Sequence, residues 1–141
     1  MIITRKVEFS ASHICRNPEL SEDENQRVFG PAANRHGHGH NYVVEVSLEG
    51  EPDPVTGMVL DLKQLKEVLN REIVDPYDHR FLNYEVSPFD TVIPTTENIA
   101  RDIWRRLAPE LCNETSRLHS IRVYETPDLY VDYRGEQRCS G

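Results

Sequence analysis

Three histidines carry the strongest chemical signal in this sequence of 141 residues. His38 and His40 are separated by one glycine, and His13 ends an earlier run that alternates apolar and polar residues. Because side chains alternate between the faces of a β-strand, histidines at i and i+2 point the same way and can bind one metal ion. Three neutral imidazoles with an open fourth position are typical of catalytic zinc, whereas structural zinc sites are closed and rich in cysteine. Imidazole also suits copper, iron and nickel, so zinc is the preferred ion among several.

Two alternating segments would hold these histidines in place. Residues 2–13 and 38–50 each have one apolar and one polar face, which predicts two β-strands. In both strands the histidines fall on the apolar face near a strand end, where a pocket at the edge of a core would place metal ligands. The residues between them, 14–36, are polar and irregular, and we expect a loop there.

Two amphipathic helices should follow. The first is expected to begin after Asp61, a good N-cap residue, and to stop at Asp75–Pro76. The second should begin at Thr95 or the next residue and end near Leu107, because Pro109 follows. Between the two helices, residues 75–94 form a long predicted loop, and long loops in compact domains are often functional.

A second pair of strands completes the predicted fold. Residues 117–126 and 129–134 alternate in the same way, with a tight turn at Pro127–Asp128. The order β-β-α-α-β-β predicts one α+β domain over residues 1–141, with a four-stranded antiparallel sheet and two helices on one face. The other sheet face and both edges would be bare in a monomer. Since sheet edges are usually paired or covered, we expect an oligomer that closes the sheets into a barrel.

Composition excludes several classes of protein. The net charge of −8 argues against nucleic-acid binding, which needs a basic surface. No apolar run is long enough to span a membrane, and the N-terminus lacks a signal-peptide core, so we expect a cytoplasmic protein with no membrane partner. The three cysteines are far apart and form no C-x-x-C pair, which argues against both a disulfide framework and a cysteine zinc site.

Three further groups could contribute to chemistry. Asp78 and His79 lie in the long loop, where they could serve as turn residues or as a proton-transfer pair near neutral pH. The segment 95–98, Thr-Thr-Glu-Asn, predicts a helix cap whose backbone N–H groups could also contact a ligand. Glu125 shares a face with Ile121 and Val123, and a half-buried carboxylate needs a partner such as a ligand with paired N–H donors.

Taken together, these segments resemble the 6-pyruvoyl-tetrahydropterin synthase family, which includes the 6-carboxytetrahydropterin synthases of the 7-deazaguanine pathway. Each motif alone is weak, but the matching segments occur in family order over nearly the whole chain. They are Phe9–His13, Phe29–Gly30, His38–Tyr42, Thr56–Asp61, Asp78–Asn83, Pro94–Asn98 and Val123–Thr126.

The resemblance implies a fold, a metal and a ligand. The fold would be the tunnelling fold, in which three β-β-α-α-β-β subunits close a barrel and two trimers stack as a hexamer. Zinc would be held by His13, His38 and His40. A pterin ring would be anchored by Glu125 in a pocket shared between subunits.

The implied reaction is a lyase step on 7,8-dihydroneopterin triphosphate. Zinc would polarise the oxygens of the substrate side chain and make the adjacent C–H groups acidic. A cysteine thiolate moves protons on one side in the family, and Asp78 with His79 would act on the other. Thr95, Thr96 and Glu97 would help to hold the pterin.

One position departs from the family pattern. The family cysteine aligns with Ala32, or near Asn34 in the carboxy-pterin branch, and no cysteine or glutamate lies between Phe29 and His38. Cys15 is two residues beyond a predicted zinc ligand and is a possible substitute. Three hypotheses follow: a pterin lyase or a variant of one, a catalytically silent pterin-binding protein, and a structural zinc domain. The product also stays open among triphosphate elimination, side-chain cleavage to a carboxy-pterin, and aldol-type cleavage.

Overall fold

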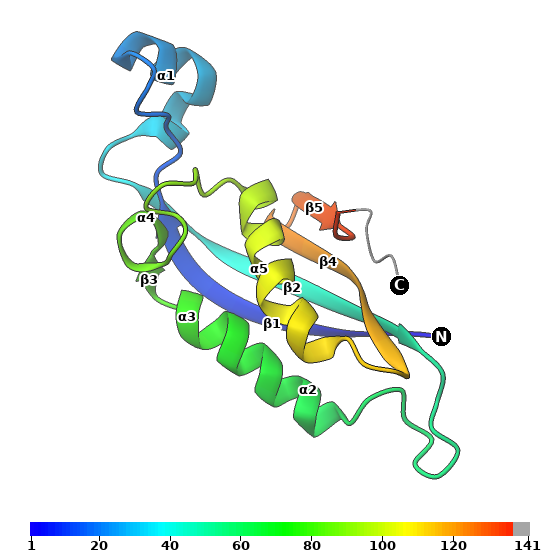
Figure 1. The fold of residues 1–141 in the computed structure, drawn as a ribbon. Helices are drawn as coiled ribbons and strands as arrows, with labels where there is room; N and C mark the ends of the chain where they lie inside the picture. Colours follow the sequence, from blue (N-terminus) through cyan, green and yellow to red (C-terminus); the bar gives the residue numbers. More distant parts are fainter. Residues whose placement is uncertain (137–141) are drawn as a thin grey trace.

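The centre of the computed structural model, which describes residues 1–136, is a five-stranded sheet in the order β3-β1-β2-β4-β5 (Figure 1). The four long strands pair antiparallel, as predicted, while the two-residue β3 pairs parallel with β1. The prediction of four strands was therefore one strand short, because a two-residue strand has no alternation to detect. The strands are β1 (Ile2–His13), β2 (His38–Gly50), β3 (Arg80–Phe81), β4 (Ser116–Thr126) and β5 (Leu129–Tyr133).

Two helices, α2 and α5, cover one face of this sheet, as predicted (Figure 1). Between the sheet and these helices lies the core, where side chains such as Val46, Ile121, Leu65 and Ile103 have no exposed surface. Burying each such side chain contributes roughly 1.5–3 kcal/mol. The helical segments are α1 (Glu22–Phe29), the 3₁₀ turn Gly30–Ala33, α2 (Leu62–Leu69), the π-helical turn Asn70–Val74, α3 (Asp75–Tyr77), α4 (Leu82–Glu85) and α5 (Thr96–Leu111).

The prediction of a loop over residues 14–36 was wrong, because α1 forms within it. Ser21 caps this helix: its hydroxyl accepts from Glu24 N at 3.1 Å, and the Glu24 carboxylate accepts from Ser21 N at 3.2 Å. This capping box is visible in the sequence, but most of the helix surface is polar, so apolar periodicity did not reveal it. In Figure 1, α1 projects from one end of the sheet.

Both predicted helix ends were too early. Asp75–Pro76 does not stop the first helix, since a π-helical turn before it leads into α3, which ends at Tyr77. A proline in the first turn of a helix loses no hydrogen bond, because that N–H has no partner there. The helix α5 continues past Pro109 to Leu111, whose side chain is buried.

The remaining boundaries agree to within one residue. Asp61 caps α2 by accepting from Lys63 N at 2.9 Å, and the Pro127–Asp128 turn joins β4 to β5. None of the helices in residues 1–136 is long and apolar enough to cross a membrane. The single domain predicted over 1–141 includes residues 137–141, which lie outside the described part of the chain.

Candidate metal centre

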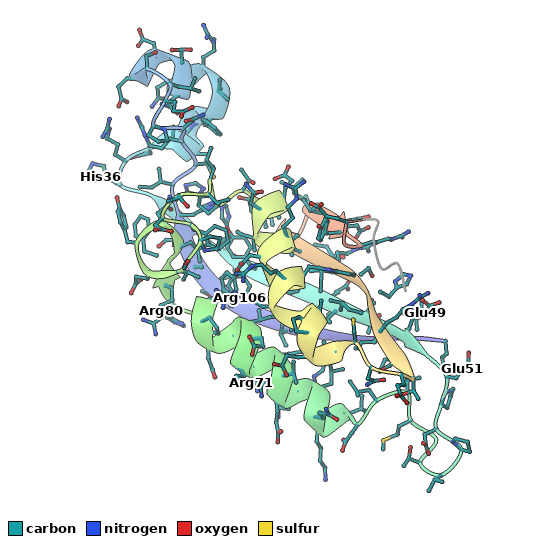
Figure 2. All side chains as sticks on the ribbon, viewed as in Figure 1. His36, Glu49, Glu51, Arg71, Arg80 and Arg106 are labelled. Carbon is teal, nitrogen blue, oxygen red and sulfur yellow. The ribbon has the colours of Figure 1, made fainter. Side chains whose placement is uncertain are left out.

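Four side chains converge at the end of the sheet from which α1 projects. His13, at the end of β1, is directly opposite His38, at the start of β2, and His40 follows on the same face. Glu125 of β4 completes the group, and the four ligand atoms all lie within 4.8 Å of one another. Figure 2 shows His36, two residues before His38, at this end of the molecule, with Glu49 and Glu51 at the opposite end.

The spacing of these atoms fits one metal ion. His13 Nε2 lies 3.0 Å from His38 Nε2, and the Glu125 Oε1 atom lies 3.1 Å from His40 Nε2. Ligands about 2.0–2.1 Å from a tetrahedral zinc are about 3.4 Å apart. His40 Nε2 is buried and makes no hydrogen bond despite its short distance to Oε1. His40 Nε2 and Glu125 Oε1 are therefore close together without a hydrogen bond between them, as two ligands of a common ion are.

His13 is held in the form that can bind a metal. Its Nδ1 atom lies 2.7 Å from the Pro94 carbonyl oxygen, so Nδ1–H donates there and Nε2 keeps its lone pair for the cluster. Burial lowers the pKa of His13, and the neighbouring His38 and His40 lower it further, against the effects of Pro94 O and Glu125. Burial also lowers the pKa of His40. Both rings therefore stay neutral near neutral pH, which metal binding requires.

Glu125 lies at a β-bulge between β4 and β5. Tyr124 pairs with Tyr130 and Thr126 with Leu129, so Glu125 is an extra residue in β4 with no partner in β5. Bulges are common next to functional sites. The pairing of β4 with β2 stays regular up to Tyr124, so alternation along β4 places the Glu125 carboxylate on the core side of the sheet, as the sequence predicts, where it faces the histidines.

The N-terminal end of α5 lies against the same cluster. Thr95 caps the helix by accepting from Asn98 N at 3.3 Å, as predicted, and Thr96 is buried. Pro94, one residue earlier, supplies the carbonyl that holds His13. Glu97 is close enough to Cys15 to raise the pKa of its thiol. The structure thus brings Pro94, and with it the start of α5, next to the metal centre.

Cys15 and Ala32 are neighbours beside the centre. Cys15 N donates to Ala32 O at 2.9 Å, and Cys15 Sγ lies 3.7 Å from His13 Nδ1, on the side of the ring away from the cluster. Burial, with Glu125 and Glu97 nearby, raises the pKa of Cys15 to about 11. The sulfur lies 3.8 Å from Pro94 O, behind the His13 ring rather than among the ligand atoms, which makes it a poor substitute for a catalytic thiolate.

Asp78 and His79 form a hydrogen-bonded pair on the edge of β1 that faces away from β2. Asp78 Oδ1 accepts from Ser10 N at 2.9 Å, and His79 N donates to Ser10 O at 2.6 Å. Asp78 Oδ2 lies 2.9 Å from His79 Nδ1. The Ser10 N–H, and then His79, lower the pKa of Asp78, so it stays ionised. His79 is 82% exposed and shares a cleft of about 520 Å³ with His40.

Asn83, to which no role was assigned from the sequence, holds the backbone beside the metal centre. Its side-chain oxygen accepts from Ile14 N at 2.8 Å, and its amide donates to Ile14 O at 2.9 Å. This pair of bonds fixes the backbone next to His13. Asn83 lies within a family motif, but no local pattern could name a partner 69 residues away.

Comparison with known proteins identifies the family. A family model described as 6-pyruvoyl tetrahydropterin synthase matches residues 2–136. The chain is 43% identical to human 6-pyruvoyl tetrahydrobiopterin synthase, over 95% of this chain and 91% of the relative. A putative 6-carboxy-5,6,7,8-tetrahydropterin synthase of Archaeoglobus fulgidus is 37% identical, over 69% of this chain and 75% of the relative.

A solved structure agrees with this result. The structure of Caenorhabditis elegans 6-pyruvoyl tetrahydropterin synthase matches with a TM-score of 0.90 at 38% identity and covers 96% of both chains. The fold and the histidine cluster thus define a tunnelling-fold protein. The chain belongs to the 6-pyruvoyl tetrahydropterin synthase family, which confirms the resemblance inferred from its motifs.

Proposed function

We propose that this protein is a zinc-dependent lyase acting on 7,8-dihydroneopterin triphosphate. The observation that carries the proposal is the convergence of three imidazoles and a carboxylate within 4.8 Å in a chain of this family. The names of the relatives support two outcomes: triphosphate elimination to a pyruvoyl-pterin, or side-chain cleavage to a carboxy-pterin. Aldol-type cleavage is a third possible outcome of the same activation.

Binding of metal and pterin is divided between two groups of residues. His13, His38 and His40 hold the zinc, which acts as a Lewis acid on the substrate side chain. Glu125 accepts N–H groups from the amino-pyrimidine edge of the pterin, a charge-assisted contact of roughly 1.5–3 kcal/mol per hydrogen bond. The segment of Thr95, Thr96 and Glu97 adds backbone and side-chain donors and acceptors on the neighbouring side.

Proton transfer is assigned to Asp78 and His79. The ionised Asp78 holds the Nδ1–H of His79, which leaves Nε2 free to take or give a proton. His79 is largely exposed, so substrate or solvent can reach that atom. The pair thus has the geometry of an acid–base catalyst, with the carboxylate as the group that orients the imidazole.

A second candidate function is pterin binding with impaired chemistry. Ala32 has no group that can accept a proton, and the buried Cys15 thiol, which lies behind the His13 ring against Pro94 O, does not replace one. Such a protein would bind zinc and pterin normally but form the pyruvoyl product slowly or not at all.

Product analysis separates these candidates. The protein, loaded with zinc, is incubated with 7,8-dihydroneopterin triphosphate in the cytoplasmic pH range, and the pterins are identified by mass spectrometry. A pyruvoyl-, carboxy- or aldol-cleaved pterin supports a lyase and names the reaction. Bound but unchanged substrate supports the binding protein. Failure to bind any pterin contradicts both candidates and favours a structural zinc domain.

We also propose that the protein works as a homo-oligomer. Within residues 1–136, no strand lies beside the outer edge of β1 from Ile2 to Ser10, and β5 is the opposite edge of the sheet. Pairing these edges between copies buries both and closes a ring. We expect light scattering to give a mass near six times the 16.3 kDa of one chain, or three times for a single ring. A monomer at micromolar concentration would contradict the ring.

A further inference from the structure

Glu125 lies closer to the histidines than a residue that only anchors a pterin needs to lie. Its Oε1 atom is 3.1 Å from His40 Nε2 and 3.5 Å from His13 Nε2, and the two facing nitrogens of His13 and His38 are 3.0 Å apart. Each of these distances is close to the roughly 3.4 Å that separates two ligands of a tetrahedral zinc. The carboxylate oxygen therefore lies beside the imidazole nitrogens, close enough to share one ion with them.

No basic side chain explains this position. Among residues 1–136, the ion-pair contacts of Glu125 are with His13 and His40 alone, and no lysine or arginine lies within 4.0 Å of its carboxylate. The side chain is only 20% exposed. A carboxylate of this burial is costly without a positive partner, and a divalent ion among the three imidazoles would supply one. Alternation along β4 directs the side chain there, on the face that it shares with Ile121 and Val123.

We propose that Glu125 is the fourth ligand of the metal when no pterin is bound, and that pterin and metal compete for this carboxylate. The inference rests on the metal site of the proposed function and gives Glu125 a second role. Pairing with two N–H donors of a pterin uses both carboxylate oxygens, so the bound pterin removes Glu125 from the metal. Without pterin, the metal has four ligands, three nitrogens and one oxygen, and no open position. One coordination position opens only when the pterin binds.

The test compares two isosteric substitutions in the full-length protein. Glu125→Gln keeps the shape and removes the charge. Glu45→Gln is the matched control: Glu45 is also a sheet carboxylate, 19% exposed, but it pairs with Lys6 and Arg122 away from the cluster. Both variants and the parent protein are loaded with Co²⁺, whose visible absorption reports the number and type of ligands. Metal affinity is measured by competition with a chelator, and 7,8-dihydroneopterin is the pterin probe.

We expect Glu125→Gln to weaken metal affinity at least about tenfold, the lower end of the loss seen when groups around a metal site are removed. Its Co²⁺ spectrum should differ from those of the parent and Glu45→Gln. The pterin should change the Co²⁺ spectrum of the parent but not that of Glu125→Gln, and should bind this variant about tenfold more weakly.

Different results overturn different parts of the argument. If Glu125→Gln matches Glu45→Gln in metal affinity and spectrum, Glu125 is not a ligand, although the three-histidine site stands. If the parent binds the pterin with no change in its Co²⁺ spectrum, pterin and metal do not compete for Glu125. This result is obtained on the parent protein alone, without any variant. A parent protein that binds no Co²⁺ overturns the proposed metal site and this inference with it.

Discussion

The metal cluster and the Asp78–His79 pair lie near the same end of β1 but are built in opposite ways. The cluster stands on three long strands that pair side by side, and its His13 is 1% exposed. The pair stands in an irregular segment at the sheet edge, where His79 is 82% exposed. A metal needs several ligands held at fixed distances, which strand register provides. A proton-transfer group needs contact with solvent or substrate, which an edge provides.

The two regions also differ in how their backbone is stabilised. The three histidines lie on β1 and β2, whose regular antiparallel pairing places His13 opposite His38. His79 instead has a φ of 59°, a left-handed conformation that costs a non-glycine residue of the order of 1 kcal/mol or more. The hydrogen bond from His79 N to Ser10 O holds it there, together with the contact with Asp78, which itself accepts a hydrogen bond from Ser10 N. Loss of one bond should therefore disturb the pair more easily than the cluster.

The largest effect should come from removing two ligands of the cluster. The double substitution of His38 and His40 by alanine leaves one imidazole, so we expect most of the bound metal to be lost. Elemental analysis of the purified protein measures this, with about one zinc per chain expected in the parent. Because Asp78 and His79 depend on other contacts, their hydrogen bonds should survive. Full metal occupancy in the double variant would show that the metal binds elsewhere, and the histidine cluster would then not be the metal site.

A smaller effect is expected from restoring a thiol beside the cluster. Acid–base groups typically contribute about 10²–10⁴-fold, so Ala32→Cys should raise pyruvoyl-pterin formation at least about a hundredfold. Turnover is measured under reducing conditions, because Cys15 N is only 2.9 Å from Ala32 O and the two thiols could otherwise form a disulfide.

The single substitution Cys15→Ala is the control for this experiment. Because the Cys15 thiol is buried behind the His13 ring, on the side away from the cluster, this variant should change the rate little. Loss of activity in Cys15→Ala would mean that Cys15 has taken over proton transfer. No gain from Ala32→Cys, with zinc and pterin still bound, would favour a protein built for binding or for another reaction.

The smallest effect should come from Asp78→Asn. The amide keeps the shape of the side chain but removes the charge that orients His79, so we expect a rate loss of about tenfold, less than the loss of an entire acid–base group. The measurement is best made in the Ala32→Cys protein, with metal content as the control. Lost metal would contradict the separation of the two regions, and an unchanged rate would remove Asp78 from the mechanism.

Much of the site could be predicted from the sequence because it depends on local periodicity. Alternation along residues 2–13 and 38–50 put the three histidines on apolar strand faces, and the caps Asp61 and Thr95 marked two helix starts. The structure bears out these elements. The short β3 and the polar α1 were missed, since neither has an apolar pattern long enough to stand out.

Which side chains share a face of a strand could be read from the sequence alone, because it depends only on the two-residue period of a strand. Which strands lie side by side, and which of their side chains meet, is set by the tertiary structure. The pairing of His13 with His38, the approach of Glu125 from a third strand, and the hydrogen bond from Ser10 N to Asp78 Oδ1 across 68 positions are long-range contacts. Their partners are chosen by packing of the whole core, and no short stretch of residues contains that information.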